Sequence, residues 1–171
     1  MSAAKVNGGM SDVQTPLKVA AMGDLHVRED NWTSYRELFG EIAREADVLV
    51  LTGDLTDLGR PREAELLAQD IKACSIPVVG VLGNHDYECG AEEEVSHILR
   101  DAGMKLLDGQ SVEIDGVGFV GVKGFAGGFG RRMLGSFGEP AIKQFVNECL
   151  SFQGKQICKY IHRRPDIAPS M

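Results

Sequence analysis

The sequence contains no apolar segment of the roughly 18–20 residues that a membrane-spanning helix needs. It also lacks a signal peptide, because residues 1–16 are polar and include no hydrophobic stretch. These two absences predict a cytoplasmic protein without a membrane partner. Residues 1–16 are expected to form a disordered lead-in.

Cysteine pairs with the spacing of a metal or redox motif are also absent. The chain has four cysteines, and none of them forms a CxxC pair; they are Cys74, Cys89, Cys149 and Cys158. Without a secretory context, they are predicted to be reduced thiols. Cys89, which lies close to a candidate site, is interpreted as an incidental thiol rather than a ligand.

Positive charge is scarce: 18 Lys and Arg residues stand against 25 Asp and Glu residues, for a net charge of -7. This balance argues against a large basic surface for nucleic acid or anionic lipid. It does not exclude a phosphorylated substrate, because a bound metal ion can invert the local field. With 171 residues and 43% hydrophobic content, the chain suits one domain with a substantial core.

Three apolar runs organise the first two thirds of the chain. Each run is predicted to be a buried parallel strand, and each is followed by Gly and then Asp or Asn; they span residues 19–22, 48–51 and 78–82. Amphipathic segments alternate with them and predict helices from Asn31 or Thr33 to Ala46, from Pro61 to Cys74, and over residues 91–102. The order predicts a βαβαβ unit of an α/β fold, with right-handed crossovers.

After Met104 the pattern changes to short strands, at residues 105–107, 112–114 and 117–122. Asp115-Gly116 between the last two strands is a strong hairpin signal. A long irregular loop over residues 121–138 and a helix from Glu139-Pro140 to about Leu150 are expected to follow.

Polar residues with metal-binding chemistry follow the three strands, where the loops of a parallel sheet converge. Asp24 and His26 are two residues apart, so on an extended chain both side chains leave the same face. Asp54 arrives from the second strand and Asn84 from the third. Imidazole, carboxylate and amide oxygen together suit Mn²⁺, Fe or Zn²⁺. Each Asp could instead be a turn or cap residue, and Asn84-His85 could be an Asn-based turn beside a surface histidine.

The three blocks that follow these strands are Gly-Asp-Leu-His at residues 23–26, Gly-Asp-Leu-Thr-Asp at residues 53–57 and Gly-Asn-His-Asp at residues 83–86. In this order and at these separations they resemble the opening blocks of the calcineurin-like metallophosphoesterases. The resemblance covers about residues 18–122, and less clearly extends to residue 150. It implies a two-sheet sandwich flanked by helices, formed by a domain over residues 17–150.

The resemblance also implies a site with two divalent ions, expected to be Mn, Fe or Zn. Asp24 and His26 would bind one ion, and Asp54 would bridge to a second ion held by Asn84. A water activated by the metals would attack the phosphorus of the substrate.

Three further residues receive roles from the resemblance. His85 would protonate the leaving oxygen or stabilise the transition state. Asp86 would orient His85 and keep it basic. Asp57 would lie behind the ligands and hold either its own loop or a ligand.

The sequence departs from the family pattern near its end. A late metal-binding His and a Gly-His-x-His block are missing, and His162 matches neither. Residues 151–171 are basic in an otherwise acidic chain. We therefore expect a truncated or frame-altered relative whose fold is incomplete at the C-terminus and whose site is weakened.

The predicted function is hydrolysis of phosphomono- or phosphodiester bonds, acting on a phosphorylated small molecule or a phosphodiester. The alternative is a non-catalytic scaffold or interaction module that retains the fold. A nuclease is disfavoured by the acidic charge. Arg131 and Arg132 could clamp a phosphate or be solvated, and His97 is expected to be solvated on its helix.

Overall fold

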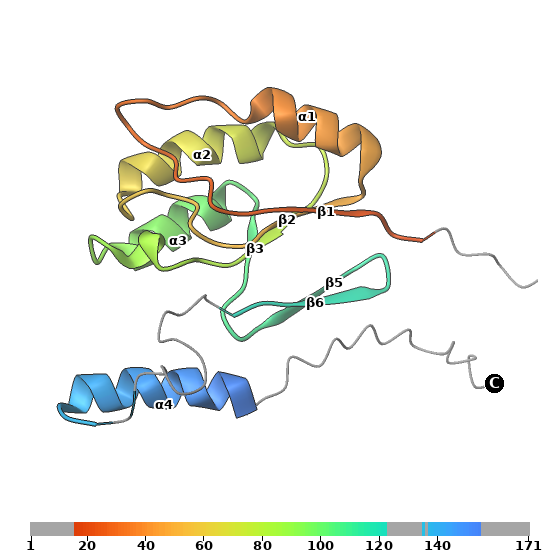
Figure 1. The fold of residues 1–171 in the computed structure, drawn as a ribbon. Coiled ribbons are helices and arrows are strands. Elements are labelled where there is room, and N and C mark those ends of the chain that lie inside the picture. Colours follow the sequence, from red (N-terminus) through yellow and green to blue (C-terminus); the bar gives the residue numbers. More distant parts are fainter. Residues whose placement is uncertain (1–15, 123–134, 136, 155–171) are drawn as a thin grey trace, which may run out of the picture.

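Strands and helices alternate along the chain in the predicted order (Figure 1). The structure is a computed structural model that describes residues 16–122, 135 and 137–154, the last seven by their backbone alone. The elements are β1 (Val19–Met22), α1 (Arg36–Glu45), β2 (Val48–Leu51), α2 (Pro61–Ala73), β3 (Val78–Gly80), the short 3₁₀ helix η1 (His85–Tyr87), α3 (Glu92–Asp101), β4 (Lys105–Leu106), β5 (Ser111–Ile114), β6 (Val117–Val120) and α4 (Pro140–Gly154).

The centre of the molecule is a parallel sheet of four strands in the order β1-β2-β3-β4. Because each strand lies beside the one before it, successive right-handed crossovers step in one direction and place their helices on one face. Figure 1 shows α1, α2 and α3 together on that face. The predicted α/β fold with parallel strands is therefore confirmed.

The two faces of the sheet bury different clusters, because successive side chains of a strand point in opposite directions. Leu49 and Leu51 pack into the main core beneath the helices, and neither is exposed. Val48 belongs to a second cluster on the other face, which includes Ile114 and has Phe119 packed against it. The antiparallel pair β5-β6, which provides these last two residues, thus covers the face that the helices leave open.

The β5-β6 hairpin has the predicted turn. Asp115 and Gly116 have φ angles of +48° and +76°. Two positive φ values in a two-residue connection are typical of a type I′ turn, whose twist matches that of the strands. The long loop predicted next, and with it Arg131 and Arg132, lies largely outside the described residues, as does His162.

Helix α1 begins at Arg36, later than the Asn31 or Thr33 start that the sequence predicts. The cause lies in α2, where Asp70 is 2% exposed. Its carboxylate accepts hydrogen bonds from the Ser34 hydroxyl at 2.7 Å and the Tyr35 amide at 2.8 Å. The Ser34 hydroxyl in turn accepts the Arg36 amide at 3.2 Å, so a neighbouring helix fixes the local residues from which α1 begins.

We expect Asp70→Ala to lower the free energy of unfolding by about 2 kcal/mol, because two part-buried donors lose their acceptor. Urea denaturation followed by circular dichroism would measure the change. Asp101→Ala is the matched control, since Asp101 is 64% exposed and its ion pair with His97 lies on the surface of α3. Equal losses from the two substitutions would contradict the capping role.

None of the helices in the described part of the chain combines the length and apolar content needed to cross a membrane.

Candidate metal centre

The loops after β1 and β2 run side by side beyond the ends of their strands. The Asp24 amide donates to the Gly53 carbonyl at 3.1 Å, and the His26 amide donates to the Asp54 carbonyl at 3.0 Å. A further parallel bridge joins Val27 to Thr56. These bonds fix the two predicted ligand-bearing loops relative to each other.

The backbone at these loops is strained. Asp24, His26 and Asp54 have φ angles of +54°, +44° and +49°. Non-glycine residues rarely adopt this left-handed region, and each instance costs about 1–3 kcal/mol unless its surroundings impose it. Three instances on two adjoining loops indicate that the fold maintains a particular arrangement of their side chains.

Glycine allows the loop after β3 to approach the loop after β2. A Cβ atom on Gly83 would collide with the backbone nitrogen and the carboxylate of Asp54. A Cβ atom on Gly53, which has a φ of +104°, would lie 2.9 Å from the Cα of Gly83. Both glycines therefore leave the space that the close approach of the two loops requires.

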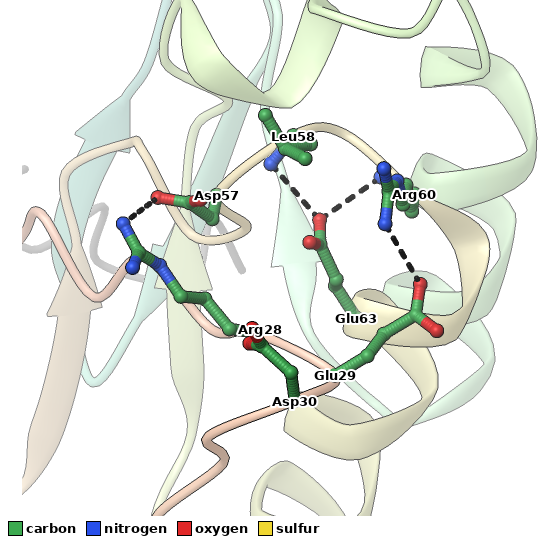
Figure 2. Close-up of a pocket in the computed structure, with 7 residues that line it drawn as sticks. All are labelled: Arg28, Glu29, Asp30, Asp57, Leu58, Arg60 and Glu63. Carbon is green, nitrogen blue, oxygen red and sulfur yellow. Dashed lines mark hydrogen bonds and ion pairs between the residues drawn. The ribbon is translucent and has the colours of Figure 1, made fainter.

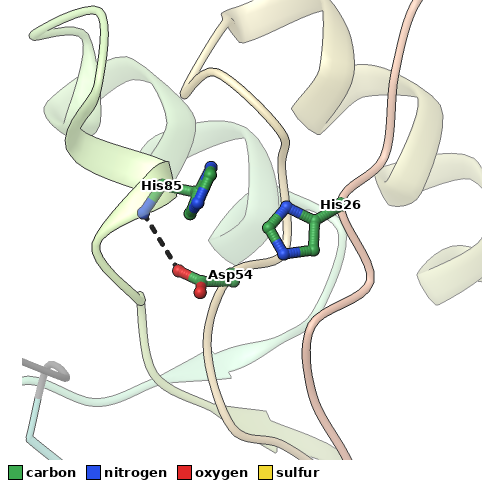
Figure 3. Close-up of side chains that lie close together, drawn as sticks. All are labelled: His26, Asp54 and His85. Atoms are coloured by element: carbon green, nitrogen blue, oxygen red, sulfur yellow. Dashed lines mark hydrogen bonds between the residues drawn. The ribbon is translucent and has the colours of Figure 1, made fainter.

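His26, Asp54 and His85 come together from these three loops (Figure 3). One potential ligand atom from each lies within 4.8 Å of those of the other two. The two imidazole rings have centroids 4.4 Å apart and are nearly perpendicular, at 85°. One Asp54 oxygen accepts the His85 amide at 2.9 Å, and its carboxylate retains further lone pairs for an ion.

The ring of His85 is held by the neighbouring loop. Its Nδ1 lies 2.8 Å from the backbone carbonyl of Asp57. A carbonyl can only accept, so Nδ1 carries the proton and Nε2 is the nitrogen left for a ligand or a substrate. This hydrogen bond, aided by the negative charges of Asp54 and Asp57, raises the pKa of His85 despite some opposing desolvation.

The carboxylate of Asp57 lies behind His26. Its Oδ1 accepts a hydrogen bond from Arg28 at 3.0 Å and lies 3.3 Å from His26 Nδ1, at ion-pair distance. The Arg28 hydrogen bond and charge, with a smaller effect of His26, hold the pKa of Asp57 below its usual value. The Asp57 carboxylate thus bonds to Arg28 and lies beside a candidate ligand, His26. None of the three sequence blocks predicts the contact with Arg28.

The side chain of Asp86 bonds to the backbone and not to the ring of His85. Its side chain is fully buried, and its two oxygens accept hydrogen bonds from the amides of Leu55, Thr56 and Gly83 and from the Thr56 hydroxyl. The expectation that Asp86 orients His85 needs correction, because the ring of His85 bonds to Asp57 and the Asp86 carboxylate faces the backbone of the β2 loop. Asp86 ties the second and third loops together.

The two remaining predicted ligands are on the surface. Asp24 and Asn84 are both exposed, and Asp24 is not part of the three-residue cluster. Asn84 precedes η1, and its backbone carbonyl accepts the Tyr87 amide at 3.2 Å. The cluster contains His85 instead, which the sequence predicts to face the substrate.

A polar cavity of about 420 Å³ adjoins the cluster through Asp57 (Figure 2). Six of its seven lining residues are charged; they are Arg28, Glu29, Asp30, Asp57, Arg60 and Glu63, and the seventh is Leu58. Arg60 and Glu29 form an ion pair at 3.7 Å. Glu63 is 2% exposed and accepts the amides of Leu58 and Arg60, which fixes the wall of the cavity.

The donor set of the cluster fits a divalent transition-metal ion. Imidazole and carboxylate ligands bind such ions at about 2.0–2.2 Å. Ligand atoms that already lie within 4.8 Å of one another need only small side-chain adjustments to reach one ion. His26 also has a buried Nδ1 without a hydrogen bond, which leaves this ring ready to place its proton toward Asp57 and its Nε2 toward an ion.

Comparison with known proteins agrees with the family resemblance of the three sequence blocks. Residues 17–155 match the calcineurin-like phosphoesterase family. A relative from Synechococcus sp. (strain ATCC 27144 / PCC 6301 / SAUG 1402/1), described as a probable cyclic nucleotide phosphodiesterase, is 31% identical over 80 residues. That alignment covers 41% of this chain and 31% of the relative, so the chain matches about a third of the relative's length.

A solved crystal structure shares the fold, with a TM-score of 0.55 at 16% sequence identity. The match covers 82% of this chain and 65% of the solved one. Since the family match spans most of the sequence and includes all three ligand-bearing loops, the chain belongs to the calcineurin-like phosphoesterase family.

Proposed function

We propose that this chain binds divalent metal and hydrolyses phosphoesters, with phosphodiesters as the favoured substrates. The observation that carries the proposal is the cluster of His26, Asp54 and His85 on three separate strand-end loops. Membership of a phosphoesterase family supports the reaction type. The description of the cyanobacterial relative as a cyclic nucleotide phosphodiesterase favours diesters over monoesters.

In this proposal His26 and Asp54 hold the ion, and Asp24 and Asn84 complete its ligands from the exposed edge. Bound divalent ions in such sites supply an activated water and neutralise charge on the phosphoryl group. Asp54 has a second task, because its hydrogen bond to the His85 amide positions the third loop.

His85, the third member of the cluster, is proposed to act on the leaving oxygen and not to bind the ion. Its Nδ1 is committed to the Asp57 carbonyl, so Nε2 is the atom that can carry a second proton toward the substrate. The hydrogen bond to the Asp57 carbonyl raises the pKa of His85, the direction that suits a proton donor. The position of His85 beside His26 and Asp54 supports this role.

The proposal is tested on the whole chain with bis(p-nitrophenyl) phosphate. We expect hydrolysis with added Mn²⁺, loss of the activity after EDTA treatment and its return when Mn²⁺ is restored. Elemental analysis of the purified chain would give the number of ions that it retains. Hydrolysis that is unaffected by EDTA would contradict the proposed metal dependence.

A second candidate is a non-catalytic module that keeps the fold and one ion. It is favoured by a specific observation, that three ligand-type side chains meet while Asp24 and Asn84 remain exposed. Mn²⁺ binding in a calorimetric titration, without release of nitrophenolate, would support this candidate over the enzyme.

A further inference from the structure

A single carboxylate oxygen joins the polar cavity to the proposed metal centre. Asp57 Oδ1 accepts a hydrogen bond from Arg28 Nη2 at 3.0 Å and lies 3.3 Å from His26 Nδ1. We propose that Arg28 is a positioning residue for the metal site, which fixes Asp57 so that its carboxylate directs His26 toward the ion. This inference rests on the proposed function, since it concerns the same ligand.

Arg28 and Asp57 can influence metal binding because they affect which ring nitrogen of His26 carries the proton. An imidazole can bind a metal only through an unprotonated nitrogen. A hydrogen bond that one ring nitrogen donates holds the proton there and leaves the other nitrogen for the metal. His26 Nδ1 is buried and without a hydrogen bond, and Asp57 Oδ1 lies 3.3 Å from it. A carboxylate fixed there favours the proton on Nδ1 and leaves Nε2 for the ion.

Arg28 is well placed to fix that carboxylate. The Asp57 side chain is 16% exposed, and its Oδ1 bonds at 3.0 Å to the guanidinium of Arg28, which is 55% exposed. The backbone supports the contact, since the Val27–Thr56 bridge and the bond from the Asp57 amide to the Val27 carbonyl at 3.1 Å hold the two loops in register. Without its guanidinium, the Asp57 side chain would be free to turn toward water.

The other arginine of the cavity provides a matched control. Arg60 is 52% exposed, lines the same cavity and forms its ion pair with Glu29, at 3.7 Å. Removing either arginine removes one positive charge from the same cavity. That loss alone should strengthen the binding of a cation. Weaker binding after the loss of Arg28 would therefore identify a local effect on the ligand.

The test is Mn²⁺ titration calorimetry on the full chain and on Arg28→Gln, Arg28→Lys and Arg60→Gln. We expect Arg28→Gln to weaken Mn²⁺ binding about tenfold, at the lower end of the effect of residues behind metal ligands. Arg28→Lys should recover part of the loss, because lysine keeps the charge but lacks the planar fork of donors. Arg60→Gln should bind as tightly as the unchanged chain, or slightly more tightly.

A second measurement does not depend on the metal. Nitrogen-15 NMR of the histidines in the metal-free chain reports which ring nitrogen carries the proton, with His26→Gln used to assign the signal. We expect the Nδ1-protonated form of His26 in the unchanged chain and a mixture of both forms in Arg28→Gln. If Arg28→Gln and Arg60→Gln bind Mn²⁺ equally and the His26 tautomer is unchanged, the inference about Arg28 is overturned but the proposed function is not. Absence of Mn²⁺ binding by the unchanged chain overturns the proposed function, while the tautomer still tests Arg28.

Discussion

Asp54→Asn is expected to reduce Mn²⁺-dependent hydrolysis of bis(p-nitrophenyl) phosphate by about 10²–10³-fold. The substitution removes the negative charge of the central ligand, and a loss of roughly 3–4 kcal/mol of electrostatic stabilisation corresponds to that factor. Asparagine keeps an oxygen that can still accept the His85 amide, a bond of 2.9 Å in the unchanged chain. The loop arrangement should therefore persist, and Mn²⁺ affinity should fall together with the rate.

The control for this experiment is His97→Gln. His97 is 76% exposed on α3, where it pairs with Asp101 at 3.3 Å as a solvated side chain, in agreement with the sequence prediction. Its replacement tests whether the loss of a histidine outside the proposed centre affects the assay. Turnover and Mn²⁺ affinity that survive Asp54→Asn would show that the proposed centre is wrong.

Asp86→Asn is expected to lower the free energy of unfolding by roughly 3–5 kcal/mol, measured by urea denaturation in the presence of EDTA. The carboxylate is fully buried and receives four donors, two on each oxygen. Asparagine offers one oxygen, so its amide group would face two buried donors. Each orphaned donor costs about 1–3 kcal/mol, and a buried charge-assisted network is lost as well.

Thr56→Val gives the matched comparison, because it removes one donor to Asp86 and changes the side-chain volume little. The Thr56 hydroxyl lies 2.6 Å from Asp86 Oδ1, and we expect its loss to cost about 1.5–2 kcal/mol. EDTA removes bound metal from both variants. The difference between their losses of unfolding free energy therefore reports the Asp86 bonds that connect the second and third loops. An Asp86→Asn loss no larger than that of Thr56→Val would contradict this role.

Most of the fold could be predicted from the sequence. The apolar face of α2, which Pro61 opens, has a helical period. The four aliphatic residues of β2 indicate a buried strand by their short length and the glycine that follows them. Asp115-Gly116 likewise specifies its own turn. Boundaries were predicted less well where the deciding contact is distant. The start of α1 depends on Asp70, which lies 35 residues further along the chain than Tyr35.

The sequence by itself determined that the loops carrying Asp24, Asp54 and Asn84 lie at one edge of the sheet, because parallel strands bring their carboxyl ends together. Only the tertiary structure decided which atoms meet there. It placed His85 in the cluster, turned the Asp86 carboxylate to the backbone of the β2 loop and set Arg28 behind Asp57. These contacts join residues about 30 positions apart, and a shift of one ångström changes the partner, so no local sequence pattern specifies them.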